Sequence, residues 1–386
     1  MQFIAMDIGA SGTRYVSDPG KISIVPNNMI FLDKNITVNL EPFNDEIESA
    51  LDVCIESSHK STYFPTRALV GSLATRRSGT NIRPSVMSSK HDQKVNYVSI
   101  ILATAISLVK QDLNNVTIPL YIALPPSEAQ SAKAKVREEL MGTFTVEFSK
   151  IGKTVVFTVG SVECFEESFL AMISYFFNMN GSVRDSSKKY SSGNVLSMDI
   201  GASTTDLAIT TDRRYIEKSG QTYRNGGNVA RDILIDLVRT EYSFDLPSEY
   251  ADIAMAEGRM QMGNNYVDVS ELVKEAKKQF AASIVEQIQS YFRKVNIPIQ
   301  SIRAIIVSGG GSMRSEYVDP EGNVLVTSEA MSYYITEELN NICSGVEVEA
   351  HSDNPRLANI TGLYIRAMID IRKKAKAAGS DSQEST

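Results

Sequence analysis

Short apolar runs followed by glycine-containing turns open the chain and recur in its middle. Residues 3–8 form a mostly apolar run, Gly9–Gly12 is a turn, and residues 13–17 return as a second short strand. The same order recurs over residues 195–211. A strand, a glycine turn and a second strand without an intervening helix predict a β-hairpin. This order differs from the strand-to-helix junction of a dinucleotide-binding fold.

Apolar residues at helical spacing predict helices in both halves of the chain. The clearest patterns cover residues 95–113, residues 163–177 and the long charged stretch 269–295. Asn354-Pro355 predicts the start of a final helix, with Asn as the cap and Pro at the first helical position. Buried-type strands separate these helices, so the pattern as a whole predicts an α/β protein.

Composition narrows the class of protein. A chain of 386 residues favours two domains, or one duplicated unit with inserts. Its 39 basic and 46 acidic residues give a net charge of -7, which argues against direct, non-specific binding of nucleic acid. The three cysteines show no disulfide or zinc spacing, so we expect a reducing cytoplasm. We expect no membrane contact, because no apolar stretch reaches the roughly 20 residues of a span and no signal peptide is visible.

One short phrase occurs twice. Asp7-Ile8-Gly9-Ala10-Ser11 near the N-terminus is repeated without change as Asp199-Ile200-Gly201-Ala202-Ser203. Each copy follows an apolar run and is followed by further Ser or Thr residues. A repeat this far apart predicts two structurally similar halves that face each other. We interpret each copy as a phosphate-binding turn, with a nucleotide between the two.

The chemistry of these turns suits a triphosphate. Backbone N–H groups in a glycine turn donate hydrogen bonds without side-chain bulk. Asp7 and Asp199 stand at strand ends, where carboxylates can hold a hydrated Mg²⁺ through water. An ordinary turn after a strand is the alternative for either copy alone, and the matching pair favours phosphate. Gly152-Lys153-Thr154 resembles the end of a Walker A loop, but Glu147 stands where that motif needs glycine, so a hairpin turn is expected there.

These residues resemble the actin, sugar-kinase and heat-shock-chaperone ATPase superfamily. Five sequence motifs occur in the order found in the superfamily, and together they span nearly the whole chain. They are the phosphate turn at Asp7–Thr13, a connecting helix at Glu163–Met172, the phosphate turn at Asp199–Asp206, the adenosine loop at Val307–Ser312 and a second connecting helix at Asn359–Tyr364.

Within the superfamily the chain looks most like the ParM-type bacterial actin-like proteins encoded on plasmids. The stretch Leu69–Ala74 with the helix after Val95 resembles their first-domain insertion. Ala123–Glu128 resembles their Gly-Leu-Pro segment, with Ala123 in place of glycine, and Leu357–Tyr364 resembles their terminal Ala-Asn-x-x-Gly-x-Tyr. The resemblance implies an actin-like two-domain α/β ATPase fold, built from duplicated ribonuclease-H-like domains with a nucleotide cleft between them. Domain I would take residues 1–164 and 345–386, and domain II residues 165–344.

The resemblance also implies roles for single residues. Glu163 is expected to orient the attacking water, although Glu166 and Glu167 could do the same, and Cys164 stands where the superfamily often has Pro. Asp7 and Asp199 are expected to be catalytic through the water shell of Mg²⁺, whereas Asp206 is expected to close its turn. The residues expected to bind nucleotide are Gly9, Ala10, Ser11, Gly12, Thr13, Gly201, Ala202, Ser203, Thr204, Gly227, Glu275, Lys278, Gly309, Gly310, Gly311 and Ser312.

Two of these assignments keep an alternative. Glu275 and Lys278 resemble a pair that touches ribose and base, but they would equally form a solvated charge pair one helical turn apart. Gly226 and Gly227 either approach the nucleotide or begin a helix.

The implied function is ATP- or GTP-driven, Mg²⁺-dependent assembly into filaments, with hydrolysis triggering disassembly. In ParM-type proteins this moves plasmid DNA through a DNA-bound adaptor of ParR type. The expected partners are therefore the chain itself and such an adaptor. A non-polymerising chaperone-like or regulatory ATPase remains the alternative. A sugar kinase is less favoured, because the sequence shows no convincing catalytic Asp base.

Overall fold

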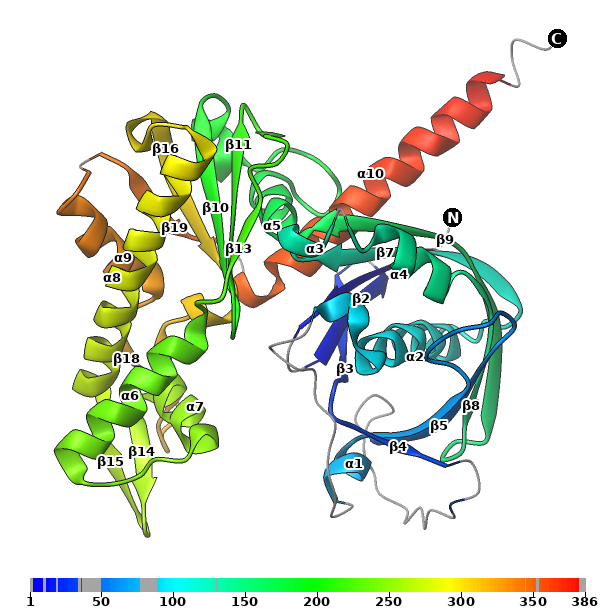
Figure 1. The fold of residues 1–386 in the computed structure, drawn as a ribbon, viewed down its shortest axis with the longest axis horizontal. Helices are drawn as coiled ribbons and strands as arrows, with labels where there is room; N and C mark the ends of the chain where they lie inside the picture. The colour runs from blue at the N-terminus through cyan, green and yellow to red at the C-terminus, as the bar shows by residue number, and fades with distance from the viewer. Residues whose placement is uncertain are drawn as a thin grey trace. The chain divides into compact units, whose positions relative to one another are not determined.

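The computed structural model describes residues 3–33, 36, 50–76, 89–351 and 354–381, except positions 10, 11, 19, 130 and 344. The chain divides into two compact units (Figure 1). Unit 1 holds Met1–Glu166, Phe177–Ser182 and Asn359–Thr386, and unit 2 holds Glu167–Phe176 and Val183–Ala358. The chain thus passes from one unit to the other several times.

Unit 1 is built on one mixed sheet. Its strands are β1 (Ile4–Ile8), β2 (Gly12–Asp18), β3 (Lys21–Pro26), β4 (Met29–Leu32), β5 (Ala50–Ser57), β6 (Thr66–Gly71), β7 (Val116–Leu124), β8 (Gly142–Phe148) and β9 (Lys153–Glu166). Among the described residues they pair in the order β3-β2-β1-β7-β9-β8-β5-β6-β4. The β1–β7 and β7–β9 pairs are parallel and the others antiparallel.

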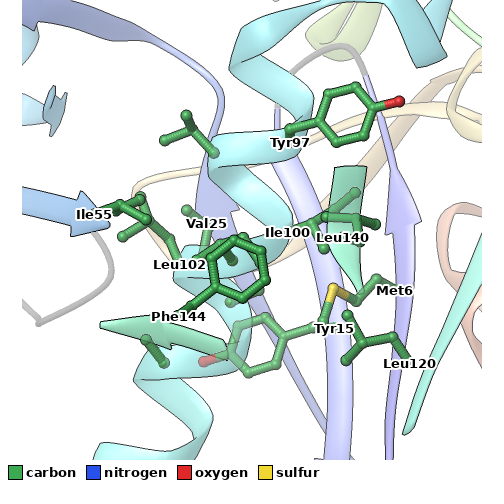
Figure 2. Close-up of a cluster of buried hydrophobic side chains, with 14 of the residues drawn as sticks. Met6, Tyr15, Val25, Ile55, Tyr97, Ile100, Leu102, Leu120, Leu140 and Phe144 are labelled. Atoms are coloured by element: carbon green, nitrogen blue, oxygen red, sulfur yellow. The ribbon is translucent and has the colours of Figure 1, made fainter. Parts of the chain in front are cut away.

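The core of unit 1 forms around one helix. The helical segments are α1 (Ser72–Arg76), η1 (Lys90–Asp92), α2 (Lys94–Lys110), α3 (Pro126–Ala129), α4 (Lys133–Leu140) and α10 (Ala358–Asp381), which enters unit 1 at Asn359. Figure 2 shows Tyr97, Ile100 and Leu102 of α2 among apolar side chains of the sheet, including Met6 and Phe144. Burial of this apolar surface stabilises the unit and holds β1 and its turn in place.

Unit 2 contains a smaller mixed sheet. In it, the strand before the second glycine turn (residues 194–200) pairs with the strand before the glycine loop (residues 302–308). Its main sheet has the order β12-β11-β10-β16-β19, with β13 also paired to β11. The strands are β10 (Asn194–Ile200), β11 (Thr205–Thr211), β12 (Arg214–Tyr215), β13 (Gln221–Tyr223), β16 (Ile302–Ser308) and β19 (Glu347–Ala350). Two hairpins lie outside it, β14 (Arg259–Met262) with β15 (Asn265–Asp268) and β17 (Ser315–Val318) with β18 (Val324–Ser328).

Helices cover both faces of the unit 2 sheet. The helical segments of unit 2 are α5 (Glu167–Phe176), η2 (Asp185–Tyr190), α6 (Gly227–Tyr242), α7 (Ser248–Glu257), α8 (Ser270–Val295), η3 (Ile299–Ser301), η4 (Gly310–Ser312), α9 (Met331–Asn340) and η5 (Pro355–Leu357). Successive side chains of β10 point to opposite faces of the sheet. Leu196 and Met198 lie in the core formed with α8 and α9. On the other face, the Ser197 hydroxyl donates to the Ser168 carbonyl oxygen of α5 at 2.7 Å. Asp199 therefore points to the α5 side of the sheet.

Most elements expected from the sequence are confirmed. Both glycine turns join antiparallel strands, β1 with β2 and β10 with β11. Gly152 lies in the turn between β8 and β9, as the exclusion of a Walker loop required. Asn354 accepts a hydrogen bond from the Arg356 backbone N–H at 3.0 Å and caps the segment before α10. None of the described helices is long and apolar enough to cross a membrane.

The helix predicted over residues 163–177 is wrong at its start. Strand β9 continues to Glu166, and α5 begins at Glu167. A β-bulge in β9 explains why the hydrophobic pattern did not indicate a strand up to Glu166. Ile118 pairs with Val159 but Pro119 pairs with Ser161, so Gly160 is an extra residue in β9. Buried positions shift from 155, 157 and 159 to 162 and 164 across the bulge, which interrupts the period of two.

The division into units also differs from the domain limits expected from the sequence. Residues 345–358, which were expected in domain I, lie in unit 2. The reason is that β19 pairs in parallel with β16, extending the sheet that carries Asp199.

Candidate functional site

The first turn is held by buried polar groups within unit 1. The Gly9 backbone N–H donates to the Gly12 carbonyl oxygen at 3.0 Å, closing the turn after β1. Asp7 is only 5% exposed, and Arg14 on β2 places Nη1 3.4 Å from its Oδ2. Ala10 and Ser11, both expected to bind nucleotide, lie outside the described residues. The turn thus carries a buried carboxylate next to a guanidinium.

Asn27 supports this turn from the next hairpin. It is 1% exposed, and its Nδ2 donates to the Gly9 carbonyl oxygen at 2.7 Å. Its Oδ1 accepts hydrogen bonds from the hydroxyls of Thr13, at 3.3 Å, and Ser99, at 2.7 Å. Thr13 is fully buried, so its hydroxyl serves the fold of the turn. Asn27 belongs to none of the site motifs identified in the sequence, so its supporting role was missed.

The second turn is packed against two other glycine segments in unit 2. Gly201 N–H donates to the Thr204 carbonyl oxygen at 2.8 Å, repeating the hydrogen bond of the first turn. The first residues of α6 then dock on this turn: Gly227 N–H donates to the Gly201 carbonyl oxygen at 2.8 Å, and Asn228 N–H to that of Ala202 at 2.7 Å. A Cβ on Gly226 would come within 2.5 Å of the Thr204 nitrogen, so glycine is required for this approach.

The loop after β16 reaches the same turn. β10 and β16 are parallel, and Asp199 lies opposite Ser308, whose hydroxyl donates to Asp199 Oδ1 at 3.1 Å. Gly309 has a φ of +90° and a Cβ there would come within 2.3 Å of the Ile200 carbonyl oxygen. Because the carboxyl ends of neighbouring parallel strands meet at one edge, both loops open on the same edge of the sheet. The loop predicted to bind the nucleoside therefore lies next to the second phosphate turn.

Three buried carboxylates meet beside this turn. Candidate ligand oxygens of Glu167, Asp199 and Asp206 all lie within 4.8 Å of one another. Asp206 is opposite Asp199 in the β10–β11 register, and Glu167 is the first residue of α5. Their exposed fractions are 5%, 7% and 2%. Such a group of carboxylate oxygens is the donor set that a hard divalent cation takes.

Glu163, the residue first expected to orient water, has different neighbours. Its side chain is 33% exposed and accepts from Arg137 Nη2 at 2.9 Å, with Lys374 Nζ 3.8 Å away. It belongs to unit 1 and stands on β9, one strand position before Cys164. The position that the sequence assigned to Glu163, the start of the helix, is occupied by Glu167.

Other residues that the sequence predicted to bind nucleotide lie on α8, in the glycine loop and in the second turn. Glu275 and Lys278 are exposed on α8, and Glu275 Oε1 accepts from Gln279 at 2.9 Å. Ser312 is 2% exposed, and its hydroxyl donates to the Gly309 carbonyl oxygen at 2.7 Å, so it shapes the glycine loop. Ser203 and Thr204 are half-buried in the turn, and Ala202 is exposed.

Two regions of the chain match models of known protein families. Residues 5–169 match the model of the actin-like proteins N-terminal domain, and residues 197–316 match the C-terminal model of the archaeal MreB-like actin homologues. No curated protein sequence matches the chain at a significant level.

Solved structures share the fold over nearly the whole chain. Actin-like protein Alp7A is 18% identical, with 99% of each chain covered and a TM-score of 0.71. The archaeal actin homologue Ta0583 is 16% identical, with 96% of this chain and 100% of that chain covered and a TM-score of 0.69. ParM of Bacillus thuringiensis, solved with ATP, is 16% identical, with 96% and 99% covered and a TM-score of 0.65.

The chain has the actin-like two-domain α/β fold, and two of its regions match models of actin-like families. ParM proteins are among the solved structures that share this fold, at 15–17% identity.

Proposed function

We propose that this chain is an actin-like ATPase that binds a nucleoside triphosphate with Mg²⁺ and assembles into filaments in a nucleotide-dependent manner. The observation that carries the proposal is the arrangement in unit 2, where buried Glu167, Asp199 and Asp206 stand beside a turn onto which two glycine segments pack. ATP in the ParM of Bacillus thuringiensis and ADP in Ta0583 support the ligand class.

The turns are proposed to bind phosphate. Backbone N–H groups of Ala202, Ser203 and Thr204 would donate to phosphate oxygens, since successive N–H groups in a turn form an anion-binding concavity. The N-terminus of α6, which docks on this turn, adds a favourable dipole for an anion. The turn at Gly9–Gly12 is proposed to do the same in unit 1, with Arg14 adding a positive charge. The glycine loop after β16 is proposed to bind the nucleoside through its backbone.

The buried carboxylates fit Mg²⁺ by the chemistry of their donors. All three supply oxygen, and Mg²⁺ usually keeps several waters while one or two carboxylates hold it. Asp199 is proposed to hold that water shell in unit 2, together with Asp206, which was expected from the sequence only to close its turn. Asp7 remains a proposed ligand of Mg²⁺ through water. When bound, the ion neutralises charge on the phosphate oxygens.

Glu167 is proposed as the residue that orients the attacking water. Phosphoryl transfer to water depends mainly on positioning and on charge stabilisation, so one fixed carboxylate aimed at the water is sufficient. Glu167 meets this need because the start of α5 fixes its backbone and its carboxylate lies within 4.8 Å of Asp199. Glu163 is less suited, because its carboxylate is paired with Arg137 and also lies near Lys374.

The test compares three variants in steady-state release of phosphate from Mg-ATP. Glu167→Gln should lower kcat by about a hundredfold, the loss typical of a positioned base, while ATP affinity changes little. Glu163→Gln should retain kcat, and Glu286→Gln, exposed on α8, serves as a matched control. Loss of activity in Glu163→Gln with full activity in Glu167→Gln would restore the assignment made from the sequence.

The finer function proposed is plasmid DNA segregation through a DNA-bound adaptor of ParR type. The shared fold with ParM structures supports it, and the net charge of -7 fits a link to DNA through another protein. In a gel-shift assay the purified chain alone should leave DNA unshifted at physiological salt. A shift that weakens steeply with salt would instead indicate direct binding to phosphate.

A further inference from the structure

Lys277 is a buried cation on α8 that the proposed phosphate chemistry does not use. Its side chain is only 3% exposed, and burial lowers its pKa to about 8. The neighbouring Glu329 acts in the opposite direction and favours the charged form. Burying an ammonium group costs free energy unless its three N–H groups donate hydrogen bonds. The acceptors of these hydrogen bonds therefore indicate which parts of the chain Lys277 holds together.

All three acceptors come from the chain that follows the glycine loop. Nζ donates to the Met313 carbonyl oxygen at 3.2 Å, to Ser315 Oγ at 2.9 Å and to the Glu329 carbonyl oxygen at 2.8 Å. Met313 directly follows η4, Ser315 begins β17, and Glu329 follows the last residue of β18. One side chain therefore fixes the exit of the glycine loop and both ends of the hairpin behind it.

The other end of the loop is tied to the carboxylate cluster. Ser308 donates to Asp199 at 3.1 Å where β16 ends, and Ser312 donates to the Gly309 carbonyl oxygen at 2.7 Å. The loop over residues 309–312 is thus held between Asp199 on one side and Lys277 on the other. A shift of Met313 would move backbone groups that pack directly on the second phosphate turn.

Packing alone does not account for an ammonium at this position. A methionine has similar length and would fill the same volume without the cost of burying a charge. What lysine adds is three directed hydrogen bonds, two of them to backbone carbonyl oxygens that an apolar side chain would leave without this donor.

We propose that Lys277 is a positioning residue that holds the glycine loop at residues 309–312 in its nucleoside-binding conformation by anchoring Met313, Ser315 and Glu329. This inference rests on the proposed nucleotide binding and adds a residue that acts through the glycine loop. Because Lys277 contacts the segment that follows the proposed nucleoside loop, its loss affects the binding of ATP more than the chemical step.

The test uses the full chain with Mg-ATP as the probe. Lys277→Met should raise KM for ATP, and Kd for Mg-ADP measured by calorimetry, by about tenfold with kcat changed less than about twofold. Lys274→Met is the matched control, because Lys274 lies on the same helix and pairs with Glu271 at 2.7 Å. It should leave both constants unchanged. Ser315→Ala removes one acceptor and keeps the lysine, so it tests the same contact if Lys277→Met does not fold, with an expected rise of about threefold.

A folded Lys277→Met variant with unchanged KM and Kd would overturn this inference, and so would a fall in kcat at constant KM. If the parent chain itself neither binds Mg-ADP nor hydrolyses Mg-ATP, the proposed function fails and this inference with it. The two failures are therefore distinguished by the behaviour of the parent chain.

Discussion

At the scale of single residues, a part-buried ion pair supports the first turn. Asp7 is 5% exposed and its carboxylate lies 3.4 Å from Arg14 Nη1. Arg14→Met leaves that carboxylate without this cation, which we expect to cost about 1–2 kcal/mol, less than for a fully buried pair because Arg14 is 20% exposed. Thermal unfolding without nucleotide or Mg²⁺ should show a lower Tm for this variant.

A double variant separates the ion pair from other roles of Arg14. Asp7→Asn combined with Arg14→Met leaves no uncompensated charge, so its Tm should recover part of the loss. If the two substitutions destabilise additively, the pair contributes no coupling free energy and the prediction is wrong.

Residues at strand ends were predictable from the sequence, whereas residues acting through long-range contacts were not. Asp7 and Asp199 follow apolar runs and precede glycine, so their strand-end positions were correctly predicted. Asn27 is recognisable as a support of the first turn only once β3 has brought it against Gly9. The grouping of Glu167 with Asp199 likewise requires that α5 be packed on the sheet.

At the scale of elements, the error at Glu163 shows what limits such predictions. The sequence around residue 163 contains an apolar alternation, but the bulge at Gly160 changes its phase. A local pattern cannot reveal a bulge, because the extra residue is defined by the partner strand. Long helices and buried strands were predictable because their periods are uninterrupted, as in α2 and α8.

The edge strand β19 is held against η2 and α5 by hydrogen bonds among charged and phenolic side chains. Glu349 accepts from Tyr175 at 2.6 Å, from Tyr190 at 2.8 Å and from Lys189. Burial alone would raise the pKa of Glu349, but the hydrogen bonds from Lys189, Tyr175 and Tyr190 outweigh it and lower the pKa. These contacts tie η2 and α5 to the edge of the unit 2 sheet.

This cluster predicts a loss of stability in acid. A carboxyl group whose pKa is lower in the folded than in the unfolded state stabilises the fold above its unfolded pKa, and that contribution is lost as the pH falls through the folded value. Glu349→Gln should therefore lower Tm at pH 7 and make Tm less dependent on pH below about 5. Glu286→Gln is the exposed control on α8, and an unchanged acid slope in Glu349→Gln would contradict the prediction.

At the scale of the whole molecule, assembly and hydrolysis must be separated to decide between a filament-forming and a non-polymerising ATPase. Binding of nucleotide can promote assembly only if the nucleotide interacts differently with the assembling and non-assembling states. Hydrolysis removes the γ-phosphate contacts, so a variant that binds ATP without cleaving it should remain assembled. Glu167→Gln is that variant if the proposed role of Glu167 is correct.

High-speed pelleting of the parent chain and Glu167→Gln tests this. With Mg-ATP the parent chain should pellet and then return to the supernatant as ATP is consumed, whereas Glu167→Gln should stay in the pellet. Mg-ADP and ATP with a chelator are the controls and should leave both chains in the supernatant. Absence of a pellet under every nucleotide and salt condition would refute filament formation. Phosphate release by the same non-pelleting sample would then favour a regulatory ATPase of the same fold.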